Sequence, residues 1–218
     1  MSESLEEVYG RRFTDVDAVA KHGLWREICR HLQRYVDVGS RVLDVACDRG
    51  YFIENIVARE RWATDIRDVS HHLSDSVRFV QADGLSLDRV LPGGAFDVVF
   101  TSNYLEHLSS GEEVIDQLRV VRELLQPDGT LIVLQPNIRL VGGAYWDFID
   151  HKVALTERSL SEAAELAGLR TTRVITRFLP YTTKSRLPQH PLIARLYLAF
   201  PPAWLILGEQ TLYFAQRR

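Results

Sequence analysis

Apolar positions in this chain follow two spacings in turn, one typical of helices and one typical of buried strands. Trp25, Ile28 and Leu32 share one helical face, which predicts a helix over 18–35. Further helices are predicted at 51–59, 112–125 and 160–167. Short apolar, β-branched runs predict strands at 41–45, 61–66, 77–81, 96–101, 130–135, 171–179 and 211–216. This alternation is typical of the α/β class, with a largely parallel sheet and helices on both faces.

Capping and helix-breaking residues mark some of these boundaries. The helix over 112–125 is followed by Pro127 and Gly129, neither of which continues a helix well. Thr156 or Ser159 is a suitable N-cap for the last predicted helix.

Composition and charge narrow the functional classes. The chain has 218 residues and a formal net charge of −3, with acidic and basic residues interspersed, so we expect no nucleic-acid partner. Two cysteines, Cys29 and Cys47, argue against a disulfide scaffold and are typical of a reducing compartment. The acidic start of the chain is unlike a signal peptide, and no uncharged apolar run reaches the ~18 residues that span a bilayer. We therefore expect a cytoplasmic protein.

Acidic residues stand at the ends of three successive predicted strands. Asp44 comes first and is followed by a tight turn that ends at Gly50, where a helix begins. Asp65 and Asp83 end the next two strands. The carboxyl ends of parallel strands meet at one edge of the sheet, where ligands bind in open α/β folds. Carboxylates accept hydrogen bonds, so the three acids predict a site for a ligand rich in donors.

Two later segments make the interpretation more specific. The fourth predicted strand continues as FDVVFTSNYLEHL, and the fifth is reached through RELLQPDGTLIVLQPN. In this order the motifs resemble the class I S-adenosylmethionine-dependent methyltransferases, in the LEHL-containing group that acts on small molecules or glycans. The resemblance implies a Rossmann-like seven-stranded sheet, mostly parallel, with an antiparallel terminal strand. It also implies S-adenosyl-L-methionine as the cofactor.

We expect a single methyltransferase domain over 1–218. An N-terminal helical segment, 1–40, precedes a cofactor-binding core at 41–137. The substrate-side part, 138–218, contains an insertion at 180–208.

The resemblance implies a role for each motif residue. Asp44 would orient the methionine amino group, Asp65 would bind the ribose hydroxyls, and Asp83 would accept from the adenine amino group. Ile66 would pack on the adenine face. The other implied cofactor contacts are Ala46, Cys47, Asp48, Gly50, Gly84, Ser102 and Asn103. No metal ligand is assigned.

The turn after Asp44 departs from the family pattern. That pattern usually reads acid-x-Gly-x-Gly-x-Gly, and here Ala46 and Asp48 replace the first two glycines. Aspartate tolerates a left-handed backbone better than most residues, so the turn can keep its shape. The Asp48 carboxylate either turns outward or faces the positively charged groups of the cofactor. An alternative stays open, in which the chain is a methyltransferase-like binding or scaffold protein with a degenerate cofactor site. A nicotinamide-dependent oxidoreductase is disfavoured because a GxGxxG motif is absent.

The segment 143–151, GAYWDFIDH, is the candidate acceptor site, because it follows the fifth strand on the side where this fold binds its methyl acceptor. Tyr145, Trp146 and Asp147 are the predicted substrate contacts, since aromatic rings offer flat surfaces on which a sugar or ring can stack. The alternative is that the rings pack a loop and the acids face water.

Three titratable residues are the catalytic candidates. His151 and Asp150 could together remove a proton from a hydroxyl or amine. If the segment is helical, Asp147 and His151 share one face. His107, within the LEHL motif, is the third candidate, and its alternative role is packing and hydrogen bonding within the motif.

The insertion at 180–208 is rich in proline and ends in an apolar stretch, 196–208. It could form a lid, a dimer contact or a peripheral membrane contact through 191–208, or it could pack on the core of the protein itself. Its FLPYTTKS segment and the apolar run resemble methyltransferases of bacterial surface-polysaccharide biosynthesis, which implies a sugar or lipid-linked glycan as acceptor.

Overall fold

A seven-stranded sheet forms the centre of the protein, in the order β3-β2-β1-β4-β5-β7-β6. The computed structural model describes residues 15–181 and 190–217. The strands are β1 (Arg41–Val45), β2 (Glu60–Asp65), β3 (Val77–Gln81), β4 (Phe96–Ser102), β5 (Leu125–Pro136), β6 (Leu169–Leu179) and β7 (Gln210–Arg217). Strands β1 to β5 pair in parallel, and β7 lies antiparallel between β5 and β6. The predicted fold class is confirmed.

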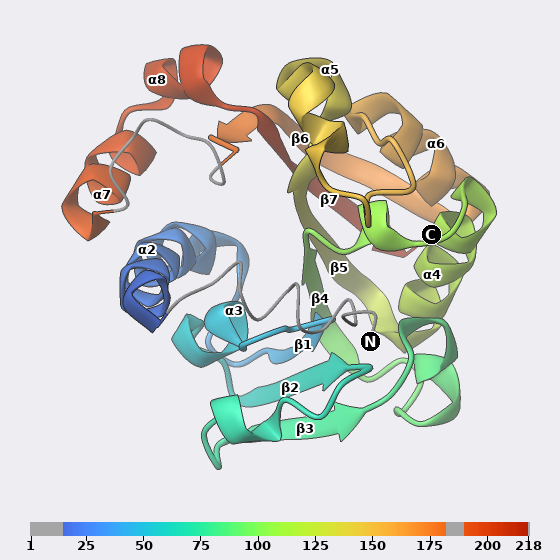
Figure 1. Cartoon of the computed structure of the whole chain (residues 1–218). Coiled ribbons are helices and arrows are strands. Elements are labelled where there is room, and N and C mark those ends of the chain that lie inside the picture. Colours follow the sequence, from blue (N-terminus) through green and yellow to red (C-terminus); the bar gives the residue numbers. More distant parts are fainter. Residues whose placement is uncertain (1–14, 182–189, 218) are drawn as a thin grey trace, which may run out of the picture.

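Helices cover both faces of this sheet (Figure 1). One face carries α2 (Asp15–Leu32), α3 (Tyr51–Asn55), α7 (Pro191–Ala199) and α8 (Pro201–Leu207), and the other carries α4 (Gly111–Leu124) and α6 (Glu157–Leu166). A short helix, α5 (Ile138–Val141), follows β5. The single-turn 3₁₀ segments are η1 (Gln33–Tyr35), η2 (Ser70–His72) and η4 (Leu105–His107), and the longer ones are η3 (Gly84–Arg89) and η5 (Gly142–Asp147).

The central strands divide their side chains between two halves of the core, because successive residues of a strand point to opposite faces. In β4, Val98 and Phe100 enter the half beneath α2 and α3. Val99, between them, enters the half beneath α4 and α6. The strands are therefore apolar on both faces, which explains their nearly continuous hydrophobic sequence.

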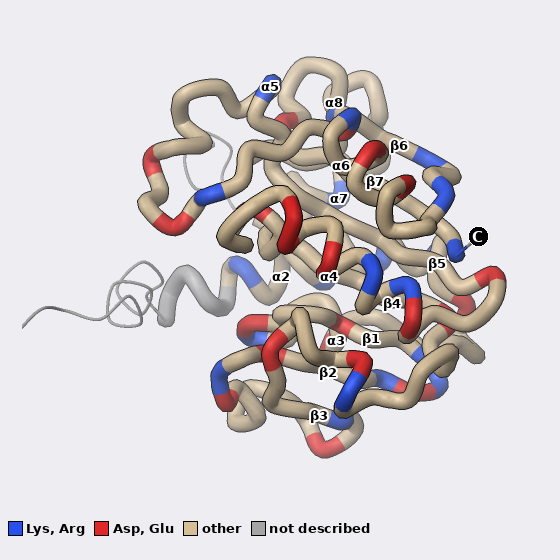
Figure 2. The backbone as a smooth tube through the Cα atoms, turned by 90° about the vertical axis from the view of Figure 1, so that its right-hand side faces the viewer, with Lys and Arg blue, Asp and Glu red and all other residues tan. Residues whose placement is uncertain are grey.

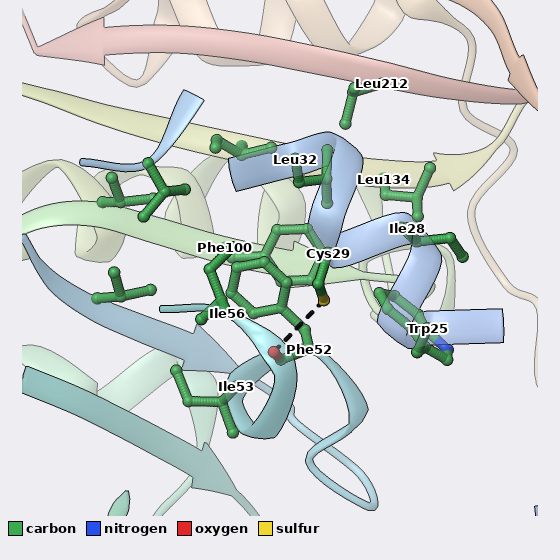
Figure 3. Close-up of a cluster of buried hydrophobic side chains, with 14 of the residues drawn as sticks. Trp25, Ile28, Cys29, Leu32, Phe52, Ile53, Ile56, Phe100, Leu134 and Leu212 are labelled. Carbon is green, nitrogen blue, oxygen red and sulfur yellow. Dashed lines mark hydrogen bonds between the residues drawn. The ribbon is translucent and has the colours of Figure 1, made fainter. Parts of the chain in front are cut away.

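Aromatic packing fixes α3 against the middle of the sheet. Phe52 of α3 stacks on Phe100 of β4 with ring centroids 3.7 Å apart, and Trp25 of α2 meets Phe100 edge-on. The Cys29 thiol of α2 donates to the Phe52 carbonyl oxygen at 3.6 Å (Figure 3). Because α3 follows the turn after β1, these contacts also hold that turn in place.

Two predicted boundaries differ most from the structure. The helix predicted over 51–59 is shorter, because the chain becomes extended at Ile56 and returns to the sheet as β2. The fifth strand begins at Leu125 and not at 130. Leu125 pairs with Phe96 across an irregularity in the ladder, so β5 starts directly where α4 ends.

The insertion before β7 forms two helices, α7 and α8, over its described part. Tyr197, Leu198 and Trp204 are buried in the core half that contains α2, so this part of the insertion packs on the protein itself. Leu196 and Ile206 remain exposed on the outer side. No helix in the described ranges is long and apolar enough to cross a membrane.

Charged residues of both signs are spread over the surface. Figure 2 shows basic and acidic positions interspersed on the side in view, as the balanced composition predicts.

A buried histidine joins α2 to the insertion and should make stability depend on pH. The His31 ring packs against Phe178 and Trp204 at centroid distances of 5.4 and 5.3 Å. Burial, with lesser contributions from Arg34 and Arg173, lowers the pKa of His31 from 6.5 to about 4. The folded state therefore binds fewer protons than the unfolded state in this range, and stability is lost as pH falls from about 6.5 to about 4.

Replacing this ring should remove that part of the pH dependence. We expect His31→Leu to show a smaller loss of unfolding free energy between pH 6.5 and 4 than the wild type in urea titrations. The exposed His22→Leu variant is the control for loss of a histidine. An unchanged slope in His31→Leu would contradict a neutral buried imidazole.

Candidate functional site

The adjacent parallel strands β1 and β4 mark the point where the strand order reverses. From this point β2 and β3 extend to one side and β5 to the other. The Thr101 hydroxyl of β4 donates to the carbonyl oxygen of Val45 at 3.0 Å, which joins the carboxyl ends of the two strands. Ligands of open α/β sheets bind at such a reversal, beyond the carboxyl ends of the strands.

The turn after β1 has a left-handed backbone at every second residue. Ala46, Asp48 and Gly50 have φ values of 57°, 50° and 68°. These are the three positions at which the family pattern has glycine, so this chain keeps the glycine conformation at two residues that carry side chains. At Gly50 a Cβ atom would also lie 2.2 Å from Leu73 Cδ2, so a side chain there would require Leu73 to move.

A second network ties this turn to the end of β2. Asp65 is 5% exposed, and its Oδ2 accepts from the backbone N–H of Asp48 at 3.0 Å. Arg67 donates to Asp65 from its backbone N–H and its Nε, both at 3.0 Å, and from Nη2 at 3.1 Å. The same Nη2 lies 3.1 Å from Asp48 Oδ1. The Asp48 carboxylate is thus bridged to Asp65 through Arg67, which nothing in the sequence indicated.

Two further groups at this end of β1 are buried. Burial raises the pKa of Asp44 well above its ordinary value, while a backbone hydrogen bond from Ile53 opposes the shift. Burial also raises the pKa of the Cys47 thiol, with Asp44 adding to the effect. A neutral buried thiol is a poor nucleophile, so we assign Cys47 a packing role in the turn and no role in covalent catalysis.

The remaining predicted cofactor contacts lie around the same edge. Ile66 is exposed beside Asp65, and exposed Asp83 caps η3 by accepting from the Leu85 N–H at 3.0 Å. A Cβ on Gly84 would come within 2.3 Å of the Tyr104 hydroxyl, so glycine is needed there. The last two predicted contacts, Ser102 and Asn103, end β4 and begin the loop after it, with Asn103 left-handed at φ 48°.

The candidate acceptor segment differs in part from its prediction. Tyr145 is fully buried, and its hydroxyl donates to the Val153 carbonyl oxygen, so it supports the segment and offers no stacking surface. Trp146 is 51% exposed and does offer one. The helical arrangement of Asp147 and His151 is wrong, because η5 ends at Asp147 and Phe148 is extended.

The structure gathers the catalytic candidates around a residue that the sequence analysis did not select, Glu106. His107 Nδ1 lies 3.1 Å from the Asp150 carbonyl oxygen and 3.3 Å from its carboxylate. The His107 and His151 ring centroids are 5.0 Å apart. Glu106 is 1% exposed, and burial raises its pKa to about 8, with Asp150 adding to the shift. The LEHL motif was the one sequence feature that could have pointed to Glu106 as a site residue. A glutamate that follows a leucine, however, gives no indication that its side chain is buried.

Comparison with known proteins assigns the fold to a family. A sequence model described as a methyltransferase domain matches residues 20–174. The chain belongs to this methyltransferase family. No curated protein matches the sequence of the chain.

Solved structures share the fold of this methyltransferase. An S-adenosylmethionine-dependent methyltransferase from Archaeoglobus fulgidus is 20% identical, with a TM-score of 0.63 over 88% of this chain and 94% of that chain. An S-adenosylmethionine-dependent methyltransferase from Mesorhizobium loti is 19% identical, with a TM-score of 0.60 over 85% of this chain and 95% of that chain. The methyltransferase CalH, in complex with S-adenosylhomocysteine (SAH), is 17% identical, with a TM-score of 0.60 over 94% of this chain and 60% of that chain. These findings support S-adenosylmethionine as the cofactor.

The left-handed turn gives a direct test of the site's backbone. Ala46→Gly should stabilise the methyltransferase by roughly 0.5–1 kcal/mol, because a left-handed backbone costs a residue with a Cβ about 1–2 kcal/mol and glycine loses more entropy on folding. The matched change Ala194→Gly, inside helix α7, should destabilise it by about 1 kcal/mol. Both values come from chemical denaturation, and a loss of stability in Ala46→Gly would contradict the assigned turn.

Proposed function

We propose that this methyltransferase transfers a methyl group from S-adenosylmethionine to a hydroxyl of a sugar, glycan or other small molecule. The observation that carries the acceptor side of the proposal is the cluster of Glu106, His107, Asp150 and His151. The Tyr145 ring connects this cluster to the exposed Trp146, with centroids 4.7 Å from His151 and 5.2 Å from Trp146. Glu106 and His107 follow β4, Asp150 and His151 lie in the segment after β5, and the turn proposed for the cofactor follows β1. These are neighbouring parallel strands, so all three segments lie at one edge of the sheet.

The residues around the turn are suited to hold the cofactor. When bound, S-adenosylmethionine supplies an electrophilic methyl group on a sulfonium. Left-handed Ala46, Asp48 and Gly50 keep the backbone compact and allow close approach. Asp65 stands at the position proposed for the ribose hydroxyls and Ile66 at that of the adenine face, while Asp44, Asp83 and the Ser102–Asn103 backbone are proposed for the amino groups. The fit requires one movement, since the Arg67 guanidinium occupies both Asp65 oxygens.

The acceptor would stack on Trp146 and present its hydroxyl to the histidines. His151 is proposed to take the proton of the hydroxyl, with the His107–Asp150 pair beside it. Asp147, exposed at the end of η5, is proposed to contact acceptor hydroxyls. Most of the rate enhancement would come from alignment of the reacting groups and exclusion of water.

Three wider features belong to the same proposal. The resemblance of the insertion to surface-polysaccharide enzymes supports a role in polysaccharide biosynthesis. The free, buried Cys29 and Cys47 suit a cytoplasmic enzyme. The exposed apolar side chains of α7 and α8 suit a peripheral membrane or dimer contact.

The competing proposal is a binding or scaffold protein that has lost its cofactor. The closed bridge between Asp65, Arg67 and Asp48 favours it, because the ribose-binding carboxylate is already satisfied. Calorimetric titration with S-adenosylmethionine separates the two, since a scaffold of this kind releases no binding heat.

The proposed cofactor contacts predict an order of effects. Asp65→Ala should weaken S-adenosylmethionine binding at least tenfold more than Asp83→Ala, a difference of ~1.4 kcal/mol. The reason is that a ribose diol loses two hydrogen bonds to a charged group, whereas an exposed adenine contact is readily replaced by water. Asp88→Ala, also on the exposed side of η3, is the control in the same calorimetric titrations. Equal or reversed losses would remove Asp65 from its proposed role.

The proposed base predicts a separation of turnover from cofactor affinity. His151→Ala should lower turnover by ~10²–10⁴-fold on a hydroxyl acceptor and leave S-adenosylmethionine affinity within twofold of the wild type. Release of SAH measures turnover over a panel of sugars and sugar nucleotides. The exposed His72→Ala variant is the control, and full activity of His151→Ala would rule out the proposed base.

A further inference from the structure

We infer that Glu106, His107 and His151 form a binding site for one divalent transition-metal ion of the zinc type. Each residue contributes one candidate ligand atom, and these atoms all lie within 4.8 Å of one another. Zinc accepts imidazole nitrogens and carboxylate oxygens at about 2.0–2.2 Å, so small side-chain rotations bring the three atoms to one ion. Two imidazoles and one carboxylate are a known catalytic zinc set.

The carboxylate of Glu106 is an independent indication of a ligand. The side chain is 1% exposed, and neither of its oxygens has a hydrogen-bond partner within the described part of the chain. A buried carboxyl group without a partner is costly, and charged groups inside proteins are normally paired or bind metals. A cation beside the two histidines would bind one of these oxygens and balance the charge of the carboxylate.

The surroundings of His107 are those of a metal ligand. A metal-bound imidazole usually donates its second N–H to a carboxylate or a backbone carbonyl, which fixes the tautomer. Asp150 offers His107 Nδ1 both kinds of oxygen, at 3.3 and 3.1 Å. With the proton on Nδ1, the lone pair of the neutral ring is on Nε2.

Backbone hydrogen bonds hold the two contributing segments together. Glu106 and His107 belong to η4, directly after β4, whereas His151 comes from the loop after η5. The N–H groups of Lys152 and Val153 both donate to the Glu106 carbonyl oxygen, at 2.8 and 3.1 Å. The residue next to His151 is therefore fixed to the residue that supplies the carboxylate, so the site is formed by the fold before any ligand arrives.

Three protein ligands leave a position open on a four-coordinate ion. With the ion bound, His151 is a ligand and does not itself take the proton; an acceptor hydroxyl at the open position would have its pKa lowered by the cation and would release its proton to water. This role of the metal rests on the proposed function, whereas the binding site itself does not.

Metal binding is tested on the full chain after chelator treatment. Calorimetric titration with zinc chloride and metal analysis after dialysis should show one zinc per wild-type chain. Glu106→Gln and His151→Gln should each lose that zinc at concentrations that saturate the wild type. Asp150→Asn should bind it roughly 10–100-fold more weakly, as expected for an outer partner of a ligand.

Controls separate this site from adventitious binding. His71 and His72 form an exposed histidine pair with ring centroids 3.9 Å apart, so the His71→Gln/His72→Gln double variant must still bind one zinc. Circular dichroism checks that each variant is folded, and zinc should raise the melting temperature of the wild type but not of Glu106→Gln. Absence of zinc binding in the wild type, or equal binding by Glu106→Gln, overturns the inference.

The same samples distinguish this inference from the proposed function. S-adenosylmethionine titrations in the presence of chelator should give the wild-type affinity, because the cofactor contacts lie on β1, β2 and η3. Cofactor binding without zinc binding would overturn the metal site and leave methyl transfer standing. Zinc binding without cofactor binding would support the metal site and contradict the proposed methyl transfer.

Discussion

The parallel pairing of β1 with β4 is the constraint on which both halves of the candidate site depend. Neighbouring strands lie about 4.8 Å apart, so whatever follows their carboxyl ends is brought together. In this chain a left-handed turn follows β1, and a short 3₁₀ segment with adjacent glutamate and histidine follows β4. The strand pair is buried on both faces. At its carboxyl end the Thr101 hydroxyl donates a hydrogen bond to the Val45 carbonyl oxygen. The strand pairing brings the two segments together, and contacts such as the bond from the Asp48 N–H to Asp65 and those from Lys152 and Val153 to Glu106 then fix each of them.

The packing beneath the sheet preserves this arrangement. Phe52 and Phe100 stack between α3 and β4, and α3 begins at the last residue of the turn. A change in the core at either ring would therefore move the turn relative to β4. This explains why a short helix of five residues carries two fully enclosed apolar side chains.

The fold and the cofactor edge could largely be predicted from local sequence, because their signals are local. Buried strands such as Arg41–Val45 are continuous apolar runs, and an acid with a following glycine marks the end of one. The environment of Glu106 was beyond such reasoning, since its burial depends on a segment more than forty positions away. Tyr145 could not be told apart from Trp146 by sequence for a different reason, because the path of its own loop decides which of the two rings is buried. An aromatic ring in a polar loop is a reasonable candidate for stacking on a substrate. Only the structure shows that the Tyr145 hydroxyl donates to the Val153 carbonyl oxygen and that the ring is buried.

The bridge that Arg67 forms between Asp65 and Asp48 has a consequence for ligand affinity at this edge of the sheet and for its dependence on ionic strength. A ligand that needs the Asp65 oxygens binds only while the guanidinium is elsewhere, so its apparent affinity is scaled by the fraction of molecules in the open form. Arg67 and Asp48 are both substantially exposed, at 39% and 48% of their side chains, and salt screens such a pair. Salt therefore weakens the outer contact of Arg67 with Asp48 first. The pair of Arg67 with Asp65, whose side chain is only 5% exposed, is screened much less, so the guanidinium should stay on the Asp65 oxygens even at raised ionic strength.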